Sequence, residues 1–76
     1  MKEVLEVIAK ALVEHPDEVS VTEIEGDNSL TLELRVADGD MGKVIGKQGK
    51  IAKAIRTVVK AAASMENMHV SVDIVQ

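Results

Sequence analysis

The sequence contains no phenylalanine, tyrosine, tryptophan or cysteine. Without cysteine it has no disulfides, no thiolate metal sites and no cysteine nucleophile. Without the large aromatic side chains it has no platforms on which nucleic-acid bases stack, and this excludes RNA binding in the style of RRM and cold-shock surfaces. The chain must therefore use other chemistry for any site it carries.

Long hydrophobic runs are also missing, since no stretch approaches the roughly 18–20 apolar residues of a membrane span. The first fifteen residues, "MKEVLEVIAKALVEH", are interrupted by Glu3, Glu6, Lys10 and Glu14. This pattern is not that of a signal peptide. We expect a soluble, cytoplasmic protein that does not contact a membrane.

The length of 76 residues predicts one domain, residues 1–76. Because 46% of the residues are hydrophobic, the chain is expected to be globular rather than disordered. A chain this small buries only about 60% of its unfolded surface, so its core is modest.

The net charge of −4 conceals a strong division along the chain. Residues 1–40 contain eleven acidic residues against three basic ones, a net of −8, whereas residues 41–60 contain six basic residues and no acid. A local positive field of this kind attracts polyanions even when the whole molecule is acidic. The alternative is a solvated helix face, which is the more common meaning of a charge run.

Four glycines lie within eleven residues, at positions 39, 42, 46 and 49, and the last two bracket the turn Gly46-Lys47-Gln48-Gly49. Gly46 is suited to end a helix in a left-handed conformation. Gly49 is suited to let another backbone approach the start of the next helix, whose free N–H groups attract phosphate. The flanking Lys47 and Lys50 favour an anion site over a turn that needs glycines for geometry alone. The spacing does not match a P-loop or a dinucleotide fingerprint.

Hydrophobic periodicity predicts an α+β fold with the order α-β-β-α-α-β. The expected helices cover residues 2–14, about 40–45 and about 49–63, and the expected strands cover 19–25, 30–36 and 69–75. A three-stranded sheet covered on one face by three helices closes this arrangement. The two consecutive helices form a crossover that allows the second and third strands to run parallel.

The helix over 49–63 is amphipathic on a helical wheel. Its predicted core arc consists of Ile51, Ala54, Ile55, Val58 and Ala62. Its opposite arc is basic and consists of Lys50, Lys53, Arg56, Thr57 and Lys60. Together with Lys43 and Lys47, this arc extends the basic patch far enough to follow a sugar-phosphate backbone.

The stretch "VIGKQG", with Ile51 and Ile55 downstream, resembles the signature of the KH domain, whose GxxG loop clamps about four nucleotides of single-stranded RNA. The element order is similar to type II KH domains. The run "MGKVIGKQGKIAKAIRTVVKAAA" resembles the small stand-alone bacterial KH proteins of the KhpA-like family. The resemblance covers nearly the whole chain and is strongest over 41–63. It departs at Ala52, where many KH domains have a large aliphatic residue.

The resemblance implies a single-stranded RNA-binding protein, acting as a post-transcriptional regulator or RNA chaperone. The predicted RNA-binding residues are Lys43, Ile45, Gly46, Lys47, Gln48, Gly49, Lys50, Lys53 and Arg56. The aliphatic wall of the groove is expected among Val36, Val44, Ile45 and Ile51, each of which is at least as suited to the core.

Catalysis has little support in the sequence. His15 and His69 are far apart, and Asp38 and Asp40 are typical of a turn and a helix cap. We expect no enzymatic activity, no cofactor and no metal.

A second reading is a protein-interaction subunit. The apolar run "TVVKAAA" predicts a homodimer with Val58, Val59 or Ala62 in its interface. The resemblance implies a heterodimer with a larger KH protein of the Jag type as a further possibility.

Overall fold

The computed structural model describes residues 1–75, and the predicted α-β-β-α-α-β order is confirmed there, with all boundaries within two residues of those expected. The helices are α1 (Lys2–Leu12), α2 (Met41–Ile45) and α3 (Lys50–Ser64), and the strands are β1 (Ser20–Gly26), β2 (Ser29–Arg35) and β3 (His69–Val75). Short 3₁₀ turns lie at η1 (Pro16–Glu18), η2 (Asp38–Asp40) and η3 (Lys47–Gly49). The predicted domain extends to Gln76, which lies outside the described residues.

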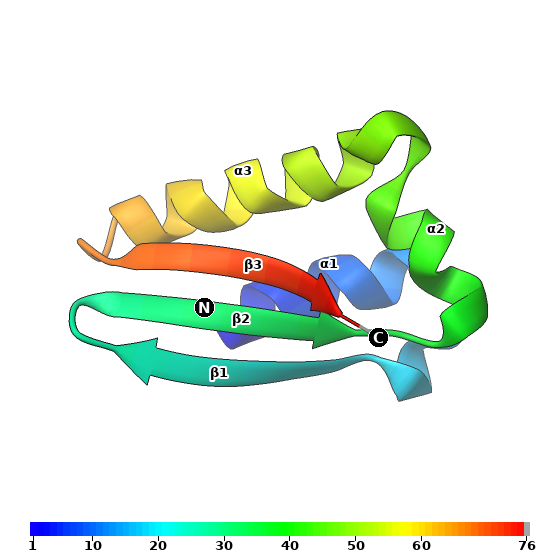
Figure 1. Ribbon diagram of the computed structural model, residues 1–76, viewed down its shortest axis with the longest axis horizontal. Helices are drawn as coiled ribbons and strands as arrows, with labels where there is room; N and C mark the ends of the chain where they lie inside the picture. The colour runs from blue at the N-terminus through cyan, green and yellow to red at the C-terminus, as the bar shows by residue number, and fades with distance from the viewer. Residues whose placement is uncertain (76) are drawn as a thin grey trace.

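The three strands form one mixed sheet with β2 in the centre (Figure 1). β1 and β2 are antiparallel and are joined by a tight turn in which Asn28 has a φ of 57°. Asparagine adopts this left-handed conformation more readily than most residues. β2 and β3 are parallel, as the predicted crossover through α2 and α3 requires. β3 is therefore an edge strand, and α3 leads directly into it.

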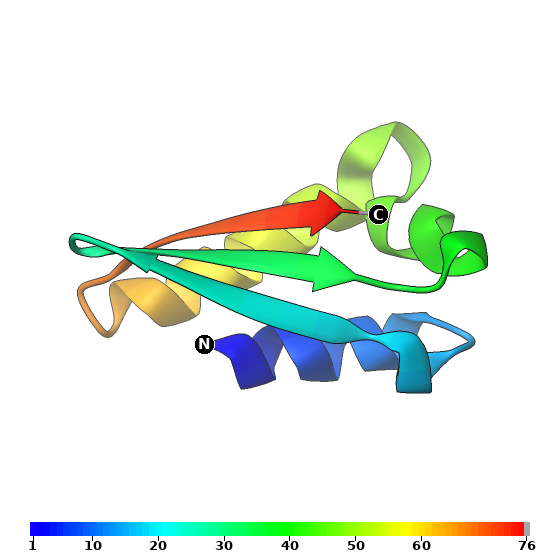
Figure 2. The same ribbon diagram turned by 60° about the horizontal axis from the view of Figure 1, so that its bottom comes forward.

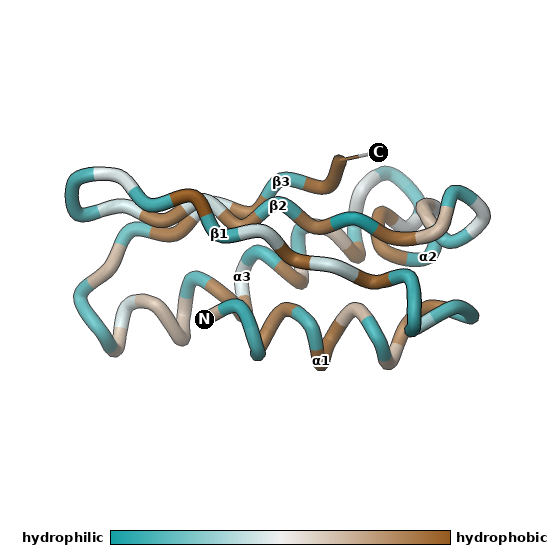
Figure 3. Tube along the Cα trace, turned by 90° about the horizontal axis from the view of Figure 1, so that it is seen from below, coloured by the Kyte–Doolittle hydropathy of each residue, from teal (hydrophilic) through white to brown (hydrophobic). Residues whose placement is uncertain are grey.

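The helices lie on one side of the sheet and leave its other face open. Viewed along its edge, α1 and α3 run beneath the strands (Figure 3), whereas α2 lies beyond the end of β2 (Figure 1). Alternate strand residues point towards the helices and are buried. The core consists of Leu5, Ala9, Val21, Leu30, Leu32, Leu34, Val36, Val44, Ala52, Ile55, Val59, Ala63, Val70 and Val72.

The buried stripe of α3 differs from the predicted arc. Ile55 is buried as expected, but Ala54 and Val58 are exposed, and the other buried positions are Ala52, Val59 and Ala63. The reason is that α3 packs against β3 on one side and α1 on the other, so its stripe is turned towards the strand.

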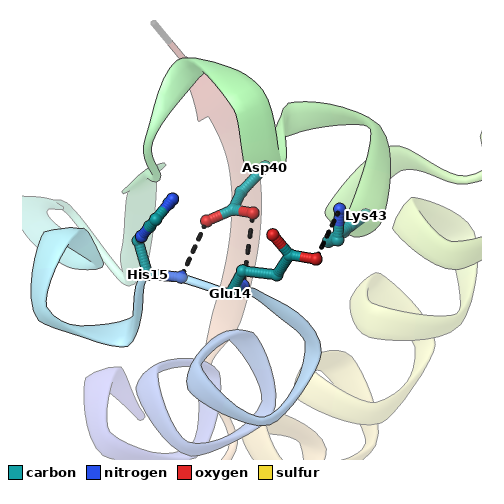
Figure 4. A network of polar contacts seen from close by, with 4 residues as sticks. All are labelled: Glu14, His15, Asp40 and Lys43. Carbon is teal, nitrogen blue, oxygen red and sulfur yellow. Dashed lines mark hydrogen bonds and ion pairs between the residues drawn. The ribbon is translucent and has the colours of Figure 1, made fainter.

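Asp40 joins the end of α1 to the start of α2 (Figure 4). Its carboxylate is 1% exposed and accepts hydrogen bonds from the amides of Glu14, at 3.2 Å, and His15, at 3.0 Å. The predicted helix cap is thus half right, because Asp40 stands at the N-cap of α2 but makes no side-chain bond to that helix. By holding the two amides outside a helix, it explains why α1 ends at Leu12 rather than at residue 14.

Candidate nucleic-acid interface

The turn between α2 and α3 depends on its first glycine. Gly46 has φ 75° and ψ 174°, a combination that is essentially restricted to glycine. A Cβ atom placed there would lie 2.5 Å from Cγ1 of Ile51, so any side chain would displace that residue. Gly46 ends α2 with a positive φ, as predicted, but its ψ of 174° places it in an extended region rather than in the predicted left-handed conformation.

Gly49 serves a different purpose. It is left-handed, with φ 73° and ψ 15°, and Gln48 beside it also has a positive φ of 58°. No atom lies within 4 Å of a Cβ built on Gly49. The backbone at the start of α3 is therefore open to the approach of another chain.

Two backbone donors in this turn are unsatisfied. The amides of Gly46 and Gly49 donate to the carbonyls of Gly42 and Gly46, at 2.9 and 3.2 Å, and the amide of Lys50 donates to Lys47. Within residues 1–75 the amides of Lys47 and Gln48 have no backbone acceptor. They lie at the positive end of the dipole of α3, where a phosphate is favoured.

The basic side chains around this turn are largely free. Lys47, Lys50 and Lys53 are exposed, and no ion pair among residues 1–75 includes them. Lys43 differs, because its Nζ lies 3.8 Å from Oε1 of Glu14 after α1 (Figure 4). An exposed pair of this kind contributes about 0–1 kcal/mol, so it does not hold Lys43 firmly. Of the predicted basic residues, Lys43 is the least available to a ligand.

Arg56 connects the basic helix to the sheet. Its Nε donates a hydrogen bond of 3.1 Å to the carbonyl of Val72 on β3. Because β3 is an edge strand, its outward carbonyls have no strand partner on this side. The half-buried guanidinium thus lies in the angle between α3 and β3, with four of its five donors unused by this bond.

Helical spacing places Lys53, Arg56 and Lys60 on the same side of α3, which we term the β3 flank. Lys60 borders a hollow shared with β3, as Arg56 borders the strand itself. Lys60 was part of the predicted basic arc but not of the predicted RNA-binding set. Lys53, Arg56 and Lys60 thus follow the turn and Lys50 along α3.

The predicted apolar wall is mostly core. Val44 is fully buried and Val36 is 8% exposed, so neither can touch a ligand. Ile45 is 36% exposed at the end of α2, and Ile51 is partly buried and faces α1. Of the four candidates, Ile45 alone combines exposure with a place beside the turn.

The fold and the glycine turn define a KH domain of type II. The family model described as KhpA/KhpB, KH domain, matches residues 2–74. The chain belongs to this family.

Two relatives are close in both sequence and length. RNA-binding protein KhpA of Clostridium acetobutylicum is 65% identical over 75 residues, covering 99% of this chain and 100% of that protein. RNA-binding protein KhpA of Clostridium perfringens is 63% identical with the same coverage.

Two crystal structures of Era share the fold. An Aquifex aeolicus Era variant bound to GDP·AlF₄⁻ superposes with a TM-score of 0.66 and 24% identity, covering 96% of this chain and 28% of that one. Era in complex with MgGDPNP and nucleotides 1506–1542 of 16S ribosomal RNA superposes with a TM-score of 0.68 and 23% identity, covering 97% of this chain and 30% of that one. At these identities the likeness shows the fold alone.

Within residues 1–75, no helix has the length and apolar character needed to cross a membrane. The same part of the chain contains no group of three or more His, Asp or Glu residues arranged to hold a metal ion.

Proposed function

We propose that the protein binds single-stranded RNA through its GxxG turn and the part of the β3 flank next to it, Lys53 and Arg56. The observation that carries the proposal is the pair of unsatisfied amides at Lys47 and Gln48, open to solvent beside Gly49 and surrounded by unpaired lysines. Amides and lysines contact phosphates and fix the register of the strand, whereas base edges supply sequence preference. The name of the clostridial relatives supports RNA as the partner.

In this proposal the chain acts as one KH domain, residues 1–76, that binds rather than catalyses. The nine predicted residues take part unequally: the four turn residues with Lys50 and Lys53 grip phosphates, Arg56 and Ile45 face bases, and Lys43 assists after leaving Glu14. A backbone grip of about four nucleotides has little selectivity. This suits a bacterial post-transcriptional regulator or RNA chaperone in the cytoplasm.

The test is a titration of fluorescently labelled single-stranded RNA, followed by anisotropy at moderate salt. We expect the parent to bind and Lys47→Asp/Gln48→Asp to lose about 100-fold or more in affinity, because two carboxylates would face the phosphates. The matched control is Lys10→Asp/Ser20→Asp, which makes the same charge change at exposed positions of α1 and β1. Equal affinity of the parent and the turn variant would reject the turn as the site.

Replacing the glycines is a less clean test than the sequence suggests. Gly46→Asp would push its Cβ into Ile51, so a loss of binding would have two explanations. Gly49→Asp meets no atom but must adopt a positive φ. The lysine–glutamine pair avoids both problems.

We also propose that the protein pairs with a second copy through the groove between α1 and α3. This groove of about 420 Å³ is lined almost entirely by apolar side chains: Ile8, Leu12, Ile51, Ala54, Ile55 and Val58, with Lys50 at its margin. Val58 is 50% exposed. An apolar groove that runs between two helices suits a two-fold pair in which the same surface of each copy covers the other.

The three predicted interface residues lie in different environments in the structure. Val58 lines the groove, whereas Val59 is fully buried and belongs to the core, and Ala62 is half-buried. A heterodimer with a larger Jag-type KH protein would use the same groove. Light scattering at high micromolar concentration should give a dimer for the parent and a monomer for Val58→Asp, and a monomeric parent would contradict the pairing.

A further inference from the structure

A second hollow lies at the far end of α3 from the GxxG turn. It has a volume of about 590 Å³ and lies between the last turns of α3, the connection after it and the start of β3. Lys60, Asn67, Met68, His69 and Ser71 are among its lining residues. Figures 1 and 2 show the GxxG turn and the connection after α3 at opposite ends of the helix.

The rim of this hollow is fixed by backbone bonds. After α3, the amides of Glu66 and Met68 donate to the carbonyl of Ala63, at 2.9 and 3.1 Å, and that of Asn67 donates to Ser64 at 3.2 Å. Asn67 has the positive φ of 57° that is common just beyond a helix end. The connection therefore holds Asn67 and His69 in place without a ligand.

The hollow continues the proposed RNA path. It opens on the β3 flank, so a strand leaving the turn passes Lys53 and Arg56 before it reaches Lys60. At about 1.5 Å per residue, Lys60 lies about 15 Å beyond Lys50 along the helix axis. Four nucleotides stacked at about 3.4 Å each cover a similar distance.

Its chemistry matches a nucleotide. None of the residues that line it is acidic, and Lys60 takes part in no ion pair within residues 1–75. His69 is exposed and carries one of the two aromatic rings in a chain that otherwise has none. Imidazole rings stack with unpaired bases, and the side chains of Asn67 and Ser71 can hydrogen-bond to base edges.

We propose that this hollow is an additional nucleotide site. It binds the base next along the strand from the GxxG-bound segment, with the base stacked on His69 and its phosphate at Lys60. The inference rests on the proposed RNA binding and deepens it, because it predicts a footprint longer than four nucleotides.

The experiment compares oligouridines of four and eight nucleotides on the parent and on Lys60→Gln/His69→Ala. The eight-nucleotide RNA offers about five registers to a four-nucleotide footprint, so a gain of about fivefold needs no extra site. In the parent we expect a gain of at least 30-fold over the four-nucleotide RNA. In the variant the gain should fall to about fivefold, with the affinity for the four-nucleotide RNA unchanged.

The matched control is Lys10→Gln/His15→Ala, which removes the same residue types at exposed positions elsewhere on the molecule. It should retain the parental gain. NMR supplies a direct readout through the ring resonances of the two histidines. Only the resonances of His69 should shift, and only when the eight-nucleotide RNA is added.

The outcomes separate the two proposals. If the four-nucleotide RNA binds but the gain is the same in the parent and the variant, the additional site is rejected and the RNA-binding proposal stands. A gain that survives in the variant because the longer RNA bridges two copies also rejects it. If no RNA binds the parent at any length, both proposals fail.

Discussion

The two flanks of α3 differ in the side chains that they present and in the elements that they face. The β3 flank presents Lys53, Arg56 and Lys60 beside an edge strand, and Arg56 is fastened to the strand by its bond to Val72. The opposite flank, which faces α1, presents Ala54 and Val58 beside an apolar groove. Fifteen residues of one helix thus carry a basic surface and an apolar surface, for which we propose RNA and a second copy of the chain as the partners.

The difference follows from what each flank faces. An edge strand exposes backbone acceptors, which attract the donors of arginine, whereas α1 offers Ile8 and Leu12. The buried stripe of Ile55 and Val59 lies between the flanks and keeps them apart. In this proposal a small domain binds two kinds of partner without enlarging its core, and an acidic protein binds RNA because six of its nine basic residues lie within residues 41–60.

The largest expected effect on stability comes from a substitution in the buried stripe that separates the two flanks. Val59→Asp places an unpaired charge in the core at a position with 0% exposure, and we expect a loss of about 4 kcal/mol or more, enough to unfold the domain. Val58→Asp, one residue earlier and 50% exposed, should change the free energy of unfolding by about 0.5 kcal/mol. Urea denaturation monitored by circular dichroism measures both, and similar effects at the two positions would contradict the assigned stripe.

A smaller loss of stability is expected where the start of α2 is bonded to the segment that follows α1. Asp40→Ala removes the acceptor of two backbone amides, which should cost about 2 kcal/mol. For a domain of this size the melting temperature should fall by about 10 °C. Asp38→Ala, at an exposed position two residues earlier, is the control and should be near neutral. Equal melting temperatures for Asp40→Ala and the parent would show that the network does not anchor α2.

The smallest effect separates base contacts from phosphate contacts. Ile45→Ala should alter the preference among single-stranded RNA sequences by a few-fold while leaving the salt dependence of binding unchanged, because it removes an apolar contact and no charge. Binding to homopolymeric RNAs of different bases at two salt concentrations measures this. A uniform loss for all bases would place Ile45 outside the base-binding surface.

Much of the fold was predictable because apolar and polar residues alternate cleanly in β2 and β3. The alternation of Leu30, Leu32 and Leu34 determines which face of β2 packs against the core. The spacing of Gly46 and Gly49 predicts the turn between the two helices. The helical arc of α3 was predicted less well, because a wheel of alanines and valines leaves its orientation open. The contact between α3 and β3 determines this orientation.

The remaining features depend on tertiary contacts that sequence spacing does not encode. Asp40 and Glu14 are 26 positions apart, and their bond determines the end of α1. The bond from Arg56 to Val72 and the hollow around His69 arise only when α3 packs beside β3. The glycine turn and the basic arc of α3 could be predicted, whereas the contacts of that arc with β3 could not.

The salt dependence of RNA binding tests the central claim most directly, since it counts the phosphates that the basic surface neutralises. With about four nucleotides bound and roughly 0.7 ions released per phosphate, log affinity should fall with log salt at a slope of about −2 to −3 per domain. Replacing Lys47 or Lys50 with glutamine should make the slope shallower by up to about 0.7 and weaken all RNA sequences nearly equally. A slope near zero in the parent would mean that the basic surface is merely solvated, and the protein-interaction role would then replace RNA binding.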